Sequence, residues 1–144
     1  MKKKITVAVS GYFNPLHVGH LEMIKKARKL GDRLIVIVNN DHQVKLKGSV
    51  PFMSQADRLK IVSSIRWVDK VFLSIDRDLS VCKSLAKAKP NIFANGGDRK
   101  NFGDVPEYDI CQKLKIKMVD GLGKKIRASS TLISEAAKKK LIKK

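Results

Sequence analysis

His17 and His20 stand three residues apart, within a stretch that reads G-Y-F-N-P-L-H-V-G-H over residues 11–20. This spacing places both imidazoles on one face of the first turn of a helix. Gly19 lies between them and would let a ligand approach the backbone closely. The N–H groups at a helix N-terminus lack intrahelical partners and carry a partial positive charge, which suits phosphate. Two imidazoles and several amides around one point predict a site for a phosphate that gains negative charge.

The flanking residues predict the elements that would hold this site. Residues 5–9 form a continuous apolar run, and residues 18–30 repeat apolar positions at close to helical spacing. The stretch is therefore a turn between a strand and a helix. Its glycine spacing is neither G-x-G-x-x-G nor G-x-x-x-x-G-K-S/T, so a dinucleotide fingerprint and a P-loop are both unsupported. A metal site is an alternative for the histidine pair, but zinc needs three or four protein ligands and no third candidate is near in the sequence.

Strand and helix patterns alternate along the rest of the chain. Further strands are predicted at residues 34–38, 68–73, 91–94 and 116–119. Further helices are predicted at residues 54–65, 79–88 and 106–114, and a final helix is predicted to begin with a cap at residues 129–131. Residues 39–53 are predicted to be a loop. This alternation predicts an α/β fold, a Rossmann-like open sheet of five parallel strands with helices on both faces. Ligands would bind at the carboxyl ends of the strands, at a switch point after the first strand.

The composition predicts one folded domain. The chain has 144 residues, of which 43% are hydrophobic and 31% charged, so we expect a single soluble domain over residues 1–144. Its net charge of +18 would attract polyanions without a specific site. The basic residues from about 138 onward are expected to form a solvated helix end or a frayed tail. A nucleic-acid-binding protein is an alternative, but few aromatic residues are interleaved with the basic clusters.

Three features of the sequence bear on the cellular compartment in which the protein is found. Cys82 and Cys111 show no C-x-x-C spacing, and we expect two reduced, buried and inert thiols. The apolar run that follows the lysines at residues 2–4 is too short for a signal peptide and has no small-residue cleavage site. No segment approaches the roughly 18 apolar residues that cross a bilayer. These features predict a cytoplasmic protein without a membrane span.

The pattern G-x-F-x-P-x-H-x-G-H between a strand and a helix resembles that of the cytidylyltransferase-like nucleotidyltransferases. Other segments extend the resemblance over nearly the whole chain, namely Lys45 and Lys47, Asp57-Arg58, Gly96-Gly97-Asp98 and Ser129-Ser130-Thr131. The Gly96-Gly97-Asp98 loop is similar to that of the heptose-phosphate adenylyltransferases. The chain departs from the pattern at Asn14, where many members carry aspartate, and in residues 124–128, where the cytidylyltransferases carry arginine and an acidic residue in a different register.

The resemblance implies nucleotidyl transfer, in which an acceptor phosphate attacks the α-phosphorus of CTP or ATP and pyrophosphate leaves. It implies that His17 and His20 donate hydrogen bonds to phosphate oxygens as charge builds. Lys45 or Lys47 would lie over the acceptor phosphate or the α-phosphate, unless both are simply solvated loop lysines. The residues implied in nucleotide binding are Gly11, Tyr12, Phe13, Asn14, Gly19, Gly97, Asp98, Arg127, Ser129, Ser130 and Thr131. Mg²⁺ is expected with the triphosphate, held mostly by phosphates and water.

We predict transfer of CMP from CTP to a small phosphorylated alcohol or sugar, similar to glycerol 3-phosphate, mainly because the chain is small and compact. The alternative is an adenylyltransferase that uses ATP on a heptose-phosphate-like or other phosphorylated acceptor, which Gly96-Gly97-Asp98 favours. For Ser129, Ser130 and Thr131, a helix N-cap alone is a further alternative. Members of the family often pair as homodimers, although no residue pattern in this chain requires it.

Overall fold

The computed structural model describes residues 4–95 and 106–119. Within these residues, five parallel strands form one sheet in the order β3-β2-β1-β4-β5. The strands are β1 (Thr6–Gly11), β2 (Arg33–Val38), β3 (Lys70–Leu73), β4 (Ile92–Ala94) and β5 (Lys117–Val119). The predicted open sheet of five parallel strands is confirmed.

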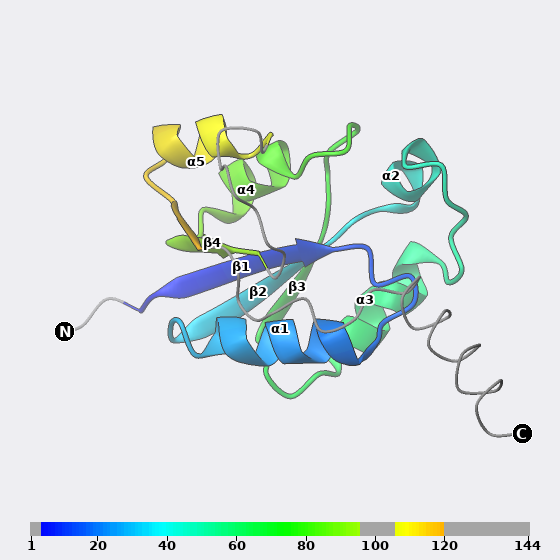
Figure 1. The fold of residues 1–144 in the computed structure, drawn as a ribbon, viewed down its shortest axis with the longest axis horizontal. Helices are drawn as coiled ribbons and strands as arrows, with labels where there is room; N and C mark the ends of the chain where they lie inside the picture. Colours follow the sequence, from blue (N-terminus) through cyan, green and yellow to red (C-terminus); the bar gives the residue numbers. More distant parts are fainter. Residues whose placement is uncertain (1–3, 96–105, 120–144) are drawn as a thin grey trace, which may run out of the picture.

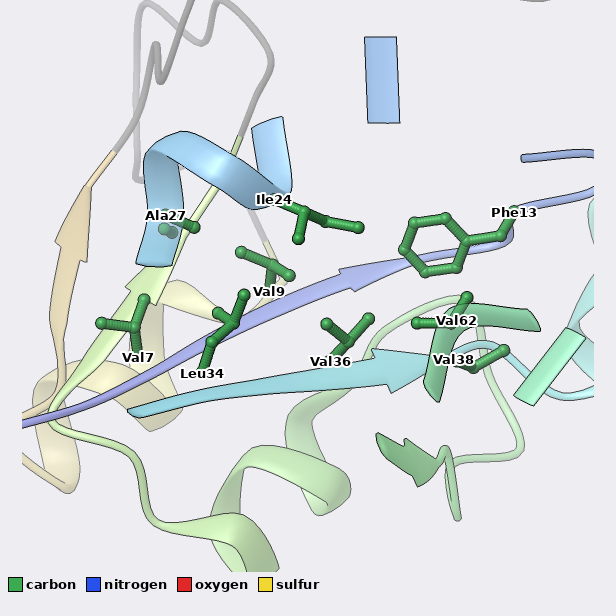
Figure 2. Packing of buried hydrophobic residues seen from close by; sticks show 10 residues of the cluster. Val7, Val9, Phe13, Ile24, Ala27, Leu34, Val36, Val38 and Val62 are labelled. Carbon is green, nitrogen blue, oxygen red and sulfur yellow. The ribbon is translucent and has the colours of Figure 1, made fainter. Parts of the chain in front are cut away.

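Helices cover both faces of this sheet, as predicted. The helices in the described residues are α1 (Val18–Arg28), α2 (Asp41–Leu46), α3 (Gln55–Ser63), α4 (Cys82–Ala88) and α5 (Tyr108–Lys113). In Figure 1, α1 and α3 lie on one face, and α4 and α5 lie on the other. Successive residues of β1 point to opposite faces, because Val7 and Val9 belong to one core with Ile24 of α1, whereas Ala8 belongs to the other with Leu85 of α4. Figure 2 shows the first of these cores.

β1 is the strand at which the strand order reverses. From β1 the chain passes through α1 to β2 on one side, and from β3 it returns through α4 to β4 on the other side. Gly11, the last residue of β1, pairs with Val38 at the end of β2. In an open α/β sheet, ligands bind beyond the carboxyl ends of the strands at such a reversal. The prediction that the turn after the first strand is the switch point is confirmed.

The prediction of a loop over residues 39–53 is wrong in part, because α2 occupies Asp41–Leu46. Asn40 caps this helix, and its side-chain oxygen accepts the N–H of Gln43. The side-chain oxygen of Gln43 accepts the N–H of Asn40 in return. This reciprocal pair is a capping box, which the sequence carries as N-x-x-Q. A helix of six residues is too short for apolar periodicity to reveal it.

The predicted helix at residues 79–88 begins only at Cys82. The buried carboxylate of Asp76 accepts the N–H groups of Lys83 and Ser84, and these contacts fix the start of α4. The other predicted ends of strands and helices in the described residues agree with the structure within two residues. The final helix predicted after residues 129–131 lies outside the described residues.

Candidate active site

Two imidazoles together cap the start of α1. His17 is the N-cap, and its Nδ1 accepts the N–H of Gly19 at 3.1 Å. The Nδ1 of His20 accepts the N–H of His17 at 3.0 Å. The two rings stack, with centroids 3.8 Å apart and an interplanar angle of 29°. The arrangement is a capping box in which both side chains are imidazoles.

These contacts fix the tautomer of both rings. A ring nitrogen that accepts a hydrogen bond carries no proton, so each neutral ring holds its proton on Nε2. Each ring therefore offers one Nε2–H donor from the nitrogen that does not face the helix backbone. The ring nitrogens already accept the N–H groups of His17 and Gly19, and the expectation that amides of the turn bind phosphate stays a prediction. Within this pair, the donors available to a phosphate are the imidazoles.

The surroundings of both rings favour the neutral form. Desolvation lowers the pKa of His17 below its ordinary value of 6.5. Desolvation and, second, repulsion from His17 lower the pKa of His20 to about 4. At neutral pH the pair thus presents two uncharged, oriented donors. Oriented donors of this kind stabilise oxygens that gain negative charge in a transition state.

Phe13 shapes the turn that precedes the histidines. Its φ is 51°, in the left-handed region, and its side chain is buried. The ring meets His20 edge-on with centroids 4.9 Å apart, and Figure 2 shows it above Val38 and Val62. A Cβ on Gly11 would come within 2.8 Å of this ring, so the close approach requires glycine. Phe13 therefore supports His20 from the core, and a contact between Phe13 and a nucleotide would have to come from its backbone.

Asn14 ties the same turn to the segment between α2 and α3. Its Nδ2 donates to the carbonyl of Val50 at 2.9 Å, and its Oδ1 accepts the N–H groups of Phe52 at 2.6 Å and Met53 at 3.3 Å. An aspartate at this position could accept both N–H groups, but it could not donate to the carbonyl. The structure therefore explains why residue 14 is an asparagine: its side-chain amide both donates and accepts, and so joins the turn to the segment between α2 and α3. The nucleotide contact predicted for Asn14 stays a prediction.

Arg58 of α3 is fully buried and joins four segments at the carboxyl edge of the sheet. Its Nη1 donates to the carbonyls of Tyr12 at 2.8 Å and Asn39 at 2.6 Å. Its Nη2 forms an ion pair with Asp41 at 2.6 Å, and its Nε donates to the carbonyl of Met53 at 3.1 Å. A buried guanidinium is tolerated only when its donors are satisfied in this way. Arg58 therefore holds the turn after β1, the end of β2 and the start of α2 together.

Lys45 and Lys47 belong to the end of α2 instead of an open loop. Both are exposed, and Lys47 is the C-cap of the helix. The Nζ of Lys47 lies 4.3 Å from the ring centroid of Tyr12, which is a cation–π contact. Burial and, second, the negative charge of Glu107 raise the pKa of Tyr12 above its ordinary value of 10.0. The structure thus brings Lys47 against the histidine turn through Tyr12.

Several predicted residues fall outside the described part of the chain. They are Gly97, Asp98, Arg127, Ser129, Ser130 and Thr131. The predicted burial of the cysteines is correct for Cys111, which is 0% exposed, and wrong for Cys82, which is half-buried. Burial raises the pKa of both thiols, to about 11 for Cys111. This shift favours the protonated, unreactive form, as expected for inert cysteines.

Metal-ligand clusters and membrane-spanning helices are both absent from the described residues. Residues 4–95 and 106–119 contain no group of three or more His, Cys, Asp or Glu side chains placed to hold a metal ion. In the same part of the chain, none of the helices has the length and apolar character needed to cross a bilayer.

Comparison with known proteins places these features in a family. The family model described as cytidylyltransferase-like matches residues 8–136. The FAD synthase of Pyrococcus abyssi is 38% identical over 117 residues, which are 81% of this chain and 73% of that protein. The bifunctional protein HldE of Aliarcobacter butzleri is 40% identical over 122 residues, which are 83% of this chain and 25% of that protein.

Solved structures of other proteins share the fold of this chain. A lipopolysaccharide core biosynthesis protein from Thermoplasma volcanium superposes with a TM-score of 0.70 at 30% identity, over 82% of this chain and 96% of that one. A pantoate-beta-alanine ligase from Francisella tularensis superposes with a TM-score of 0.58 at 19% identity, over 90% of this chain and 62% of that one, and shares the fold.

Proposed function

The chain belongs to the cytidylyltransferase-like family of nucleotidyltransferases, and we propose that it is an adenylyltransferase that transfers AMP from ATP to a small phosphorylated acceptor. The observation that carries nucleotidyl transfer is the pair of neutral, mutually oriented imidazoles of His17 and His20. FAD consists of AMP joined to FMN, so the relatives named FAD synthase support ATP as the donor. They favour the alternative interpretation of the sequence over transfer of CMP to a glycerol-phosphate-like acceptor.

The proposed reaction is a single displacement. A phosphate oxygen of the acceptor attacks the α-phosphorus of ATP, the bond from that phosphorus to the bridging oxygen breaks, and pyrophosphate leaves with the electron pair. Such a reaction needs positioning and charge stabilisation more than covalent help. The Nε2–H groups of His17 and His20 donate to the phosphate oxygens that gain charge. Gly19 gives those oxygens room beside the first turn of α1.

The other predicted residues complete this proposal. Lys45 and Lys47 supply positive charge for the acceptor phosphate or the α-phosphate. Gly11 and Phe13 shape the turn, and Tyr12 and Asn14 hold it against α2 and the following segment. The predicted contacts with the base and the triphosphate come from Gly97, Asp98, Arg127, Ser129, Ser130 and Thr131.

Mg²⁺ fits this site as a companion of the nucleotide. Because no group of three ligand side chains stands in residues 4–95 and 106–119, the ion would be held mainly by phosphate oxygens and water. When bound, it would offset charge on the triphosphate. Binding and orientation of the reacting phosphates would remain with the histidines and lysines.

Pyrophosphate release tests the proposal. The protein is incubated with Mg²⁺ and each of ATP, CTP, GTP and UTP, in separate reactions with FMN, a heptose 1-phosphate and glycerol 3-phosphate. We expect release with ATP and a phosphorylated acceptor, and no release when the acceptor is omitted. Release with CTP and glycerol 3-phosphate alone would restore the other interpretation. Salt-sensitive binding of polynucleotides without any release would instead indicate a nucleic-acid-binding protein.

A further inference from the structure

Exposed apolar side chains gather beside the histidine turn. Val50 is 77% exposed and Phe52 is 82% exposed, both in the segment that connects α2 to α3. Leu46 at the end of α2 and Val18 at the start of α1 are also about half exposed. Phe52 has the largest exposed fraction of the large hydrophobic residues in the described part of the chain. An aromatic ring left this open to water on a segment bound to the candidate site is a candidate for contact with a ligand.

The backbone that carries these two side chains is held in place. The single side chain of Asn14 contacts the carbonyl of Val50 and the N–H of Phe52. Asn14 lies only three residues before His17 in the turn. The exposure of Val50 and Phe52 therefore belongs to an ordered segment that is bound directly to the reactive turn. Because this backbone is already held, a ligand that covers the two side chains does not have to order the segment as well.

Positive charge lies next to this apolar pair. Lys45 and Lys47 are exposed at the end of α2, a few residues before Val50 in the chain. Lys47 sits against Tyr12, so its charge is held at the turn. A ligand that fits both features carries a phosphate for the lysines and an apolar, planar body for the exposed aromatic ring. A sugar phosphate has the first of these parts and lacks the second.

We propose that Val50 and Phe52 bind the planar ring system of the acceptor, and that they select a flavin-type phosphomonoester over a sugar phosphate. The inference rests on the proposed adenylyl transfer, because it names the acceptor class of that same site. Phe52 is the principal contact, through stacking or edge contact with the ring system. Asn14 is a positioning residue, because it acts through the backbone of the segment.

Direct binding of FMN tests this assignment without relying on turnover. Quenching of flavin fluorescence reports the Kd for FMN and for riboflavin, which lacks the phosphate, and calorimetry reports the Kd for ribose 5-phosphate, which lacks the ring. In Phe52→Ala we expect the Kd for FMN and riboflavin to rise about tenfold, as for other lost aromatic stacking contacts. The Kd for ribose 5-phosphate should not change. Phe52→Tyr keeps a ring and should restore most of the affinity for FMN.

The matched control is Leu114→Ala. Leu114 is also exposed and apolar, but it ends α5 immediately before β5, at the amino-terminal edge of the sheet, away from the histidine turn. Its truncation should leave all three Kd values unchanged. The inference is overturned if the unaltered protein does not bind FMN, or if Phe52→Ala binds FMN normally. It is also overturned if Phe52→Ala weakens ribose 5-phosphate equally, or changes only the oligomeric state.

The same samples keep the two proposals distinguishable. Protein that binds FMN through Phe52 but releases no pyrophosphate from ATP with any of the three phosphorylated acceptors supports the flavin contact and refutes the proposed adenylyl transfer. Protein that adenylylates a sugar phosphate and ignores FMN supports the transfer and refutes the flavin contact.

Discussion

His20 accepts the backbone N–H of His17 through Nδ1 at 3.0 Å, and the two rings stack with centroids 3.8 Å apart. Each histidine therefore has a structural and a proposed chemical function at once. The Nδ1 atoms cap the helix, and the Nε2–H groups are the donors for the reaction. This division allows the two functions to be separated by substitution.

Replacing His17 by asparagine should remove the donor and keep the cap. Asparagine is among the best N-cap residues, so the free energy of unfolding should change by no more than about 0.5 kcal/mol. Turnover should fall by about a hundredfold or more, as when an oriented donor to a developing charge is lost. Urea unfolding and pyrophosphate release on the same sample measure the two effects. Turnover within threefold of the original would contradict the proposed role of His17.

Stability should decrease as the solution becomes acidic, with His20 as one cause. The pKa of His20 is about 4 in the folded protein, whereas an unfolded histidine has its ordinary value of 6.5. Between these pH values the unfolded chain binds more protons, so the free energy of unfolding falls as the pH falls through this window. Protonation at Nδ1 also removes the acceptor for the N–H of His17.

His20→Gln is the control for this pH dependence, because glutamine can complete a capping box and does not titrate. Denaturant midpoints measured from pH 7.5 to 4.5 should fall less steeply in the variant than in the original protein. Parallel curves would show that His20 does not contribute to the acid sensitivity.

Arg58→Ala should be severely destabilising. The substitution leaves the carbonyls of Tyr12 and Asn39 and the carboxylate of Asp41 without their guanidinium partner. The Asp41 side chain is 32% exposed and can be solvated, so the main cost comes from the backbone carbonyls that lose a buried donor, at about 1–3 kcal/mol each. Chemical denaturation measures the loss in the free energy of unfolding. The control is Arg33→Ala at the exposed start of β2, for which this free energy should stay within about 0.5 kcal/mol of that of the original protein. Equal stabilities of the two variants would be incompatible with the contacts of Arg58.

Asn14→Asp should loosen the segment between α2 and α3 without removing the segment itself. The carboxylate can still accept the N–H of Phe52, but it cannot donate to the carbonyl of Val50 and would repel it. We expect a loss of about 1–3 kcal/mol, together with faster hydrogen exchange in residues 48–53. Asn91→Asp is the matched control, because the side-chain oxygen of Asn91 accepts the N–H of Thr6 and an aspartate preserves that bond. Unchanged hydrogen exchange of residues 48–53 in Asn14→Asp would argue against the role of Asn14 in holding this segment.

The order of strands and helices was readable from the sequence because each element carries its own local pattern. Apolar runs marked β1 and β2, and a Ser-x-x-Asp start marked α3, with Ser54 as the observed cap. The sequence did not predict helix α2, because the only local pattern that marks this helix is the capping pair of Asn40 and Gln43. The position of α2 matters for the proposed site, because Lys47, Val50 and Phe52 lie at its end and in the residues that follow it.

The sequence by itself determined the α/β alternation, the turn with its paired histidines and the family to which that turn points. These are properties of neighbouring residues, which bonded geometry and periodicity control. Only the tertiary structure decided that ring nitrogens occupy the amides of His17 and Gly19. Only the tertiary structure showed that contacts of Asn14 and Arg58 tie the turn to residues 36 to 46 positions away along the chain. Those contacts depend on strand order and burial, which fix distances between residues that no local pattern relates.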